Sequence, residues 1–123
     1  MHELSIAATI LENVLDFAEK QGAVKVLRVR LAIGEFTCIQ SEQLKFCYAS
    51  VTNQTKLADS ELEIETVPAR VSCAHCAYEG PPKYWMDSPA DTPLATLQCP
   101  TCGKSVEAIQ GQECAIKTVQ YAT

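Results

Sequence analysis

The chain has 123 residues, of which 47% are hydrophobic and 20% are charged, as in an ordinary globular protein of one domain or of a small domain carrying a smaller one. No apolar run reaches the roughly 18 residues of a membrane span, and the first residues lack a signal peptide's basic and apolar regions, so we expect a cytoplasmic protein with reduced thiols. The net charge is −5 and no segment is basic, which argues against a nucleic-acid-binding surface.

The first two predicted elements are a helix and a strand. From residue 4 to residue 22, apolar residues recur every three or four positions, which predicts an amphipathic helix that ends near Gly22. A strand that ends at Gly34 follows, because apolar residues alternate with Arg28, Arg30 and Ala32. The residues expected on the buried faces are Leu4, Ala7, Ala8, Leu11, Val14, Leu15 and Ala18 of the helix and Leu27, Val29, Leu31 and Ile33 of the strand.

A second helix and two more strands are predicted further along. Ser41 is a candidate N-cap of a helix with Leu44, Cys47, Tyr48 and Val51 on its inner stripe. Residues 61–67 alternate most cleanly and form a strand closed by Pro68, and residues 113–121 return to an extended, β-branched pattern. Between residues 68 and 112 lie all six prolines and four of the seven cysteines, with little periodicity.

These elements predict an α+β fold, in which two helices pack on a small three-stranded sheet and a zinc-ribbon-like four-cysteine lobe is inserted before the last strand. The first predicted domain comprises residues 1–68 and 113–123, and the second comprises residues 69–112. We expect Tyr84, Trp85 and Met86 to form the small apolar cluster of the lobe.

The strongest motif is a pair of Cys-x-x-Cys turns, Cys73 to Cys76 and Cys99 to Cys102, separated by 22 residues. Each turn presents two sulfurs to one ion, and two facing turns complete a tetrahedron with Zn–S bonds of roughly 2.3 Å. Gly103 is expected to take the positive φ that turns N–H groups toward the sulfurs. We predict a structural zinc site without an open position, while four-sulfur iron, which uses the same ligands, remains an alternative.

The other cysteines and the histidine between two ligands have simpler expected roles. His75 is predicted to face solvent from its turn. Cys47 and Cys114 are predicted to be buried small hydrophobic residues, whereas Cys38 follows the first strand with no basic neighbour to activate it.

The amino terminus carries the second histidine, His2, beside the amine of Met1, which we expect to be retained because histidine is bulky. The amine, the imidazole and the backbone amides of His2 and Glu3 can offer four nitrogens in a plane, which suits Ni(II) or Cu(II) and not Zn(II). Alone, the pattern favours a frayed, solvated terminus.

Taken together, the start Met-His-Glu-Leu-Ser, the strand end Ile-Gly-Glu at residues 33–35 and the two late cysteine turns closely resemble the HypA/HybF family of hydrogenase nickel-incorporation proteins, over essentially the whole chain. The resemblance implies a nickel metallochaperone, not an enzyme, that passes Ni(II) with the GTPase HypB to the large-subunit precursor of a [NiFe] hydrogenase. It implies nickel donors at Met1 (terminal amine), His2 (side chain and backbone) and Glu3 (backbone amide), and zinc ligands at Cys73, Cys76, Cys99 and Cys102.

Three other functions stay open at this point. The first is a zinc-ribbon module that binds nucleic acid, against which the charge argues. The second is a zinc enzyme, for which the sequence offers no His-Glu helical motif, nucleophile elbow or phosphate-binding glycine loop. The third is a zinc adaptor without a nickel role. The sequence does not decide between a monomer and a homodimer, or whether the row Glu61, Glu63 and Glu65 is a solvated face or a docking edge.

Overall fold

The computed structural model describes residues 3–86 and 93–123, and the chain divides into two compact units. Unit 1 comprises Met1–Ala32, Ile39–Glu65 and Ala115–Thr123, and unit 2 comprises Ile33–Cys38 and Thr66–Cys114. The short segment Ile33–Cys38 thus groups with unit 2, whereas the sequence-based division leaves it in the first domain. Within the described residues, no helix is both long and apolar enough to cross a membrane.

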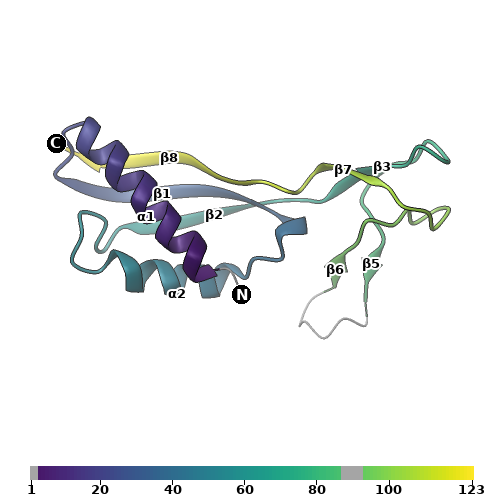
Figure 1. Ribbon diagram of the computed structural model, residues 1–123, viewed down its shortest axis with the longest axis horizontal. Helices are drawn as coiled ribbons and strands as arrows, with labels where there is room; N and C mark the ends of the chain where they lie inside the picture. Colours follow the sequence, from purple (N-terminus) through teal and green to yellow (C-terminus); the bar gives the residue numbers. More distant parts are fainter. Residues whose placement is uncertain (1–2, 87–92) are drawn as a thin grey trace. The chain divides into compact units, whose positions relative to one another are not determined.

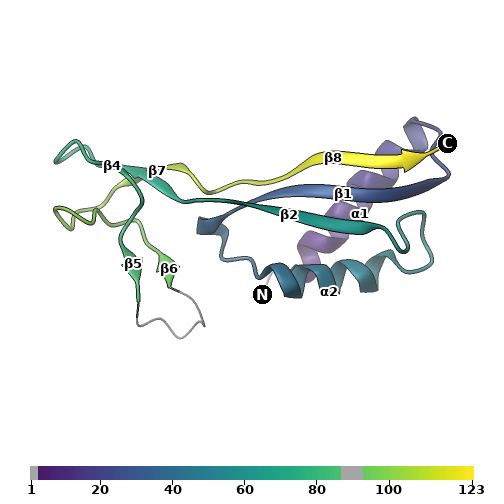
Figure 2. The same ribbon diagram turned by 180° about the vertical axis from the view of Figure 1, so that it is seen from behind.

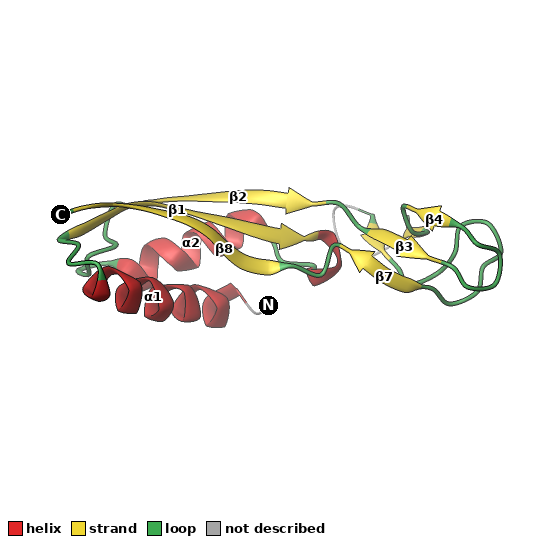
Figure 3. Ribbon diagram, turned by 90° about the horizontal axis from the view of Figure 1, so that it is seen from above, coloured by secondary structure: helices red, strands yellow, loops and turns green. Residues whose placement is uncertain are grey.

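Unit 1 is built on a three-stranded sheet in the order β2-β1-β8, formed by β1 (Lys25–Gly34), β2 (Glu61–Val67) and β8 (Cys114–Ala122). In Figure 1, the helix α1 (Glu3–Lys20) crosses the strands of this sheet, whereas α2 (Ser41–Thr52) runs alongside it, below β2. Seen from behind, the sheet lies in front of α1 (Figure 2), and seen from above, both helices lie on the same side of it (Figure 3). The predicted arrangement of two helices on a three-stranded sheet is confirmed.

The buried face of α1 differs from the predicted stripe. Ala7, Val14 and Ala18 are buried as expected, but Leu4 is 59% exposed, while Ile10, which the predicted stripe omits, is only 5% exposed. Further apolar residues lie between the predicted ones, so the sequence offers two overlapping stripes at helical spacing. Packing against α2 and the sheet selects the stripe that passes through Ile10.

The start of β1 also departs from the prediction. Val26 is fully buried and Leu27 is 48% exposed, the reverse of the expected alternation. The N–H of Val26 donates to the carbonyl of Lys56 at 2.9 Å, so this end of the strand is held by the loop that precedes β2. From Val29 onward the residues predicted to be buried, Val29, Leu31 and Ile33, are buried. Ala32, which the alternation places on the other face, is buried as well, at 5% exposure.

Two arginines of β1 form ion pairs with two glutamates of β2 at the surface of the sheet. Arg28 lies 3.1 Å from Glu61, and Arg30 lies 3.2 Å from Glu63. Exposed ion pairs of this kind contribute little to stability. The acidic row on β2 is therefore partly neutralised by its neighbouring strand.

The first turn of α2 is capped differently from the prediction. Ser41 is the first helical residue, and the N-cap is Gln40, which has φ −84° and ψ 114° and no side-chain capping hydrogen bond. The predicted role of Ser41 is wrong, because the backbone becomes helical one residue earlier than a Ser41 cap requires. The predicted inner stripe is confirmed at Leu44, Cys47 and Tyr48, which are buried.

Unit 2 contains short strands that the sequence did not reveal individually. One sheet has the order β4-β3-β7, and β5 pairs with β6 in a separate two-stranded sheet. The bounds are η1 Glu35–Thr37, β3 Arg70–Ser72, β4 Glu79–Gly80, β5 Tyr84–Trp85, β6 Leu94–Ala95 and β7 Glu107–Gln110. Strands of two to four residues are too short to display the alternation by which a strand is recognised.

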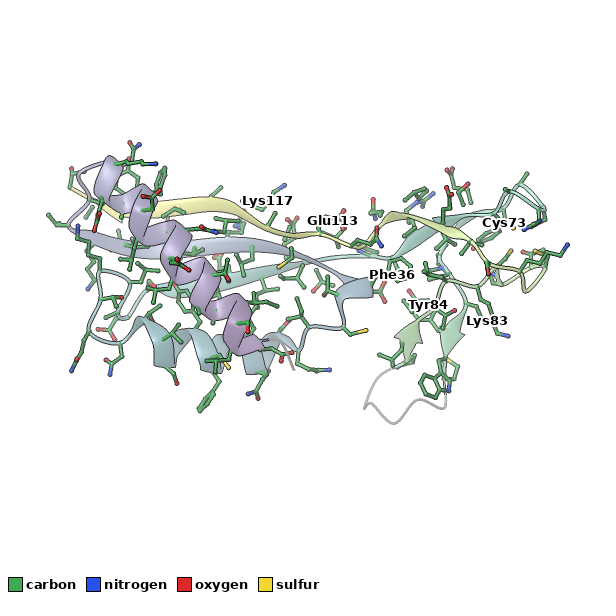
Figure 4. The ribbon with its side chains drawn as sticks, in the orientation of Figure 1. Phe36, Cys73, Lys83, Tyr84, Glu113 and Lys117 are labelled. Atoms are coloured by element: carbon green, nitrogen blue, oxygen red, sulfur yellow. The ribbon has the colours of Figure 1, made fainter. Side chains whose placement is uncertain are left out.

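The core of unit 2 is small and is not the cluster that the sequence predicted. It consists of Val71, Cys73, Cys99 and Val106, with Phe36 and Tyr78 packed against it (Cys73 and Phe36 are labelled in Figure 4). Trp85 is 48% and Met86 72% exposed, so the predicted apolar cluster of Tyr84, Trp85 and Met86 is wrong. An isolated two-stranded hairpin has too little surface to bury such side chains.

Two glycines mark a close crossing of chain segments in unit 2. The N–H of Phe36 donates to the carbonyl of Gly111 at 2.8 Å. A Cβ on Gly34 would collide with that same carbonyl and would lie 2.7 Å from the nitrogen of Gln112. Gly111 has φ +107°, and a Cβ there would lie 2.8 Å from the Cα of Ala69. The crossing therefore requires glycine at both positions.

Candidate metal centre

The two Cys-x-x-Cys turns have the same backbone geometry. In each, the N–H of the first cysteine donates to the carbonyl five residues later, at 2.8 Å. The carbonyl of the first cysteine accepts from the N–H four residues later, at 3.0 Å in the first turn and 2.9 Å in the second. The residues at this fourth position, Ala77 and Gly103, have φ of +62° and +76°.

The positive φ predicted for Gly103 is confirmed, and the equivalent role of Ala77 was missed. A non-glycine residue rarely adopts this conformation, so the alanine itself gives no signal. Aligning the two turns on their cysteines would have placed Ala77 at the position of Gly103. This repeat of the motif was the signal in the sequence.

The four sulfurs converge on one point. All four Sγ atoms lie within 4.8 Å of one another, and the Cys73–Cys102 and Cys76–Cys99 pairs are each 3.6 Å apart. A tetrahedral ion with bonds of about 2.3 Å requires sulfurs about 3.8 Å apart. The donor set and its spacing therefore fit one tetrahedral metal ion. Among the described residues, the group that can hold a metal consists of these four cysteines.

Each turn contributes one buried and one exposed sulfur ligand. Cys73 is 2% and Cys99 1% exposed, whereas Cys76 and Cys102 are exposed. The buried ligands also belong to the core of unit 2, so the same two side chains line the metal site and pack against the apolar core residues. His75 is exposed in its turn, as predicted.

The backbone favours the ionised form of the buried sulfurs. Burial raises the pKa of the Cys99 thiol. The N–H groups of Cys102 and Thr101, at 3.5 and 3.4 Å from its sulfur, together with the thiols of Cys76 and Cys102, lower that pKa by more, to about 6. The pKa of the Cys73 thiol is likewise lowered, because burial is outweighed by hydrogen bonds from the N–H groups of Cys76 and His75 and from the thiols of Cys102 and Cys76. The thiolate, which is the form that binds a metal, is therefore favoured at the buried cysteine of each turn. At the exposed Cys76 the backbone N–H of Tyr78 lowers the thiol pKa, but burial and the three neighbouring sulfurs raise it by more, to about 12.

The burial of the cysteines outside the metal site agrees with the prediction at Cys47 but not at Cys114. Cys47 is buried, at 7% exposure, as predicted. Cys114, expected to be buried, is exposed at the start of β8, where the strand leaves unit 2, so that prediction is wrong. Cys38 is exposed and has φ +57° at the end of η1.

Of the three residues predicted to bind nickel, the structure describes one. Met1 and His2 lie outside the described residues. Glu3 begins α1, is only 3% exposed, and accepts a hydrogen bond on its carboxylate from the N–H of Gln40 at 3.0 Å. The burial of this charged side chain was not predicted from the sequence, which suggested only a favourable charge at the start of a helix.

Two helices on a three-stranded sheet, together with a unit that gathers four cysteine sulfurs, define a small metal-binding protein of the α+β class. A family model described as "Hydrogenase/urease nickel incorporation, metallochaperone, hypA" matches residues 1–121. The chain belongs to this HypA family.

Named relatives agree with this assignment, and a solved structure has a similar fold. The hydrogenase maturation factor HypA of Methanopyrus kandleri is 39% identical, over 98% of this chain and 92% of the relative. The factor of the same name from Methanocella arvoryzae is 38% identical, over 98% and 97%. The fold is similar to the solution structure of the Ni metallochaperone HypA from Helicobacter pylori, with a TM-score of 0.64, 19% identity, and coverage of 99% and 98% of the two chains.

Proposed function

We propose that this chain is a nickel metallochaperone, which binds Ni(II) at its N-terminal residues and delivers it for maturation of a [NiFe] hydrogenase large subunit. The observation that carries the proposal is the family match, which begins at residue 1 and therefore includes the Met-His-Glu tripeptide as well as the cysteine turns. The proposed donors are the amine of Met1, the imidazole and backbone nitrogen of His2 and the backbone amide of Glu3. Four nitrogens in a plane suit Ni(II).

A terminal site of this kind suits a metal carrier. It uses one side chain together with backbone nitrogens, so the bound ion remains accessible. A partner can then remove the nickel by exchanging one ligand after another. We therefore regard nickel as cargo and not as a resident cofactor.

The second metal in the proposal is zinc, held by Cys73, Cys76, Cys99 and Cys102. Support comes from the four-sulfur donor set and its fit to a tetrahedral ion. Four protein ligands leave no position for a substrate, so this zinc has a structural role. In functional terms, residues 1–68 and 113–123 are the proposed nickel-binding domain, and residues 69–112 are the proposed zinc-binding domain.

We further propose the GTPase HypB and the hydrogenase large-subunit precursor as partners, with the chain acting as a carrier and not as an enzyme. Relatives named as hydrogenase maturation factors support a hydrogenase as the destination. The chain acts in the cytoplasm, as a monomer or homodimer, without nucleic acid or membrane. The reducing cytoplasm keeps the four thiols available for zinc.

The proposal is tested by replacing His2. The zinc-loaded His2→Ala variant is expected to lose nickel binding in a calorimetric titration with nickel chloride, while its zinc content and circular dichroism stay unchanged. The matched control is His75→Ala, which removes the other histidine of the chain and is expected to keep the wild-type nickel affinity.

X-ray absorption at the nickel edge then identifies the donors. A nitrogen shell in the wild-type protein supports the terminal site. If His2→Ala binds one Ni(II) per chain with unchanged affinity and a planar spectrum, the terminal site is wrong. If nickel is found in a sulfur shell, the cysteine site is the cargo site.

A further inference from the structure

The N-terminus of α2 is capped by a side chain from α1. The N-cap Gln40 makes no side-chain capping hydrogen bond of its own. Its backbone N–H instead donates to Oε2 of Glu3, 37 positions earlier in the chain, at 3.0 Å. A carboxylate at this place is also favoured by the positive end of the helix dipole.

In a typical capping box, the backbone N–H of the N-cap residue donates to a side chain of the same helix. The acceptor is a Glu or Gln at the third helical position, which in α2 is Gln43. The side-chain amide of Gln43 is turned along the helix and donates to Sγ of Cys47 at 3.9 Å. Glu3 therefore accepts the N–H of Gln40 in place of Gln43.

The carboxylate of Glu3 is held firmly, because it is nearly inaccessible to solvent. Glu3 is 3% exposed, and a buried carboxylate depends on its hydrogen bonds for stability. Breaking the contact with Gln40 would leave a buried charge with less compensation. The contact therefore ties the first residue of α1 to the first turn of α2.

We propose that the Glu3 side chain is a positioning group, which anchors the nickel-binding tripeptide to the N-terminus of α2. The inference rests on the proposed function, since it concerns the segment in which Met1 and His2 supply the donors. Glu3 is the third residue of that tripeptide, so anchoring its side chain restricts the backbone amide that is offered to nickel. The nickel affinity thereby depends on α2, which lies outside the proposed donor set.

The test uses two pairs of variants in the zinc-loaded, full-length protein. Glu3→Gln removes the charge of the acceptor, and Glu12→Gln makes the same change at an exposed position of α1. Gln40→Pro removes the donor N–H without touching the tripeptide, and Gln40→Ala keeps it. Gln40 has φ −84°, close to the range that proline requires, so the proline is compatible with the backbone.

Nickel chloride titrations measure the coupling. Glu3→Gln and Gln40→Pro are each expected to weaken nickel binding roughly tenfold, the effect of freeing about one residue's backbone. Glu12→Gln and Gln40→Ala are expected to bind like the wild type. The nickel-edge absorption spectrum is expected to be the same in all variants. If Glu3→Gln weakens binding and changes the spectrum while Gln40→Pro does neither, the carboxylate is a nickel ligand and the positioning role is wrong.

A measurement without nickel separates this inference from the proposed function. In the amide NMR spectrum of the nickel-free protein, Glu3→Gln is expected to shift the Gln40 resonance and to speed its hydrogen exchange, whereas Glu12→Gln leaves both unchanged. An unchanged Gln40 resonance in Glu3→Gln overturns the anchor, whatever the nickel titrations give. If the anchor is observed but His2→Ala does not affect nickel binding, it is the proposed function that fails.

Discussion

Single residues decide the backbone path of unit 2 at the place where Gly34 and Gly111 meet. Each glycine lies where a Cβ would overlap main-chain atoms of another segment, which cannot move aside as a flexible side chain can. The requirement at Gly34 is steric, because only Gly111 of the two has a positive φ.

Replacement of Gly34 by alanine is expected to be severely destabilising. The collision with the Gly111 carbonyl predicts a loss of about 3 kcal/mol or more in the free energy of unfolding. Gly22→Ala is the control, since Gly22 has φ +68° but open space around it, and backbone strain alone predicts a loss of about 1 kcal/mol. Urea denaturation of both variants measures the difference, and equal losses would contradict the steric explanation.

The exposure of the cysteines predicts the order in which they react with iodoacetamide. In the folded, zinc-loaded protein, Cys38 and Cys114 are expected to be alkylated first, because both are exposed and lie outside the metal site. Cys47 is expected to react only after unfolding. Peptide mass spectrometry at successive times gives the order, and protection of Cys114 would favour the original prediction that it is buried.

At the scale of elements, α1 shows how periodicity identifies a helix without choosing its buried face. The helix itself was predicted to within a few residues at each end. Its orientation about its own axis was not, because two apolar stripes overlap in the sequence. The choice is made by the surface that receives the helix.

A pair of alanine substitutions distinguishes the two stripes of α1. Ile10→Ala is expected to lower the free energy of unfolding by about 2–5 kcal/mol, since Ile10 is 5% exposed and its removal leaves a cavity. Leu4→Ala is expected to change it by no more than about 0.5 kcal/mol, since Leu4 is 59% exposed. Chemical denaturation of both variants provides the measurement. The reverse order of effects would support the stripe predicted from the sequence.

At the scale of the whole molecule, the two units depend on different sources of stability. Unit 1 has a core of apolar side chains from its helices and sheet, among them the fully buried Val14, Leu31 and Leu44. In unit 2, two of the four core residues are the cysteines of the metal site. A unit with so few apolar core residues requires the metal.

Removal of the metal is therefore expected to unfold unit 2 and to leave the helices of unit 1 in place. A strong chelator should collapse the NMR dispersion of amides in residues 66–114, while the helical circular dichroism changes little. The metal contributes on the order of 10 kcal/mol to such sites. Addition of zinc should restore the spectrum. Loss of the helical signal together with unit 2 would show that the units do not fold separately.

The sequence by itself determined the class of fold, the two helices, the three long strands and the four metal-binding cysteines. These features have local signals: helical spacing, alternation and the Cys-x-x-Cys turn each act within a few residues. The equivalence of Ala77 and Gly103 was also present in the sequence, in the repeat of the motif.

Only the tertiary structure decided which face of α1 is buried, that Cys114 is exposed, and that the core of unit 2 is built on Cys73 and Cys99. It also decided that Glu3 caps α2. Each of these depends on contacts between segments far apart in the chain, and no local pattern of residues records which segments will meet.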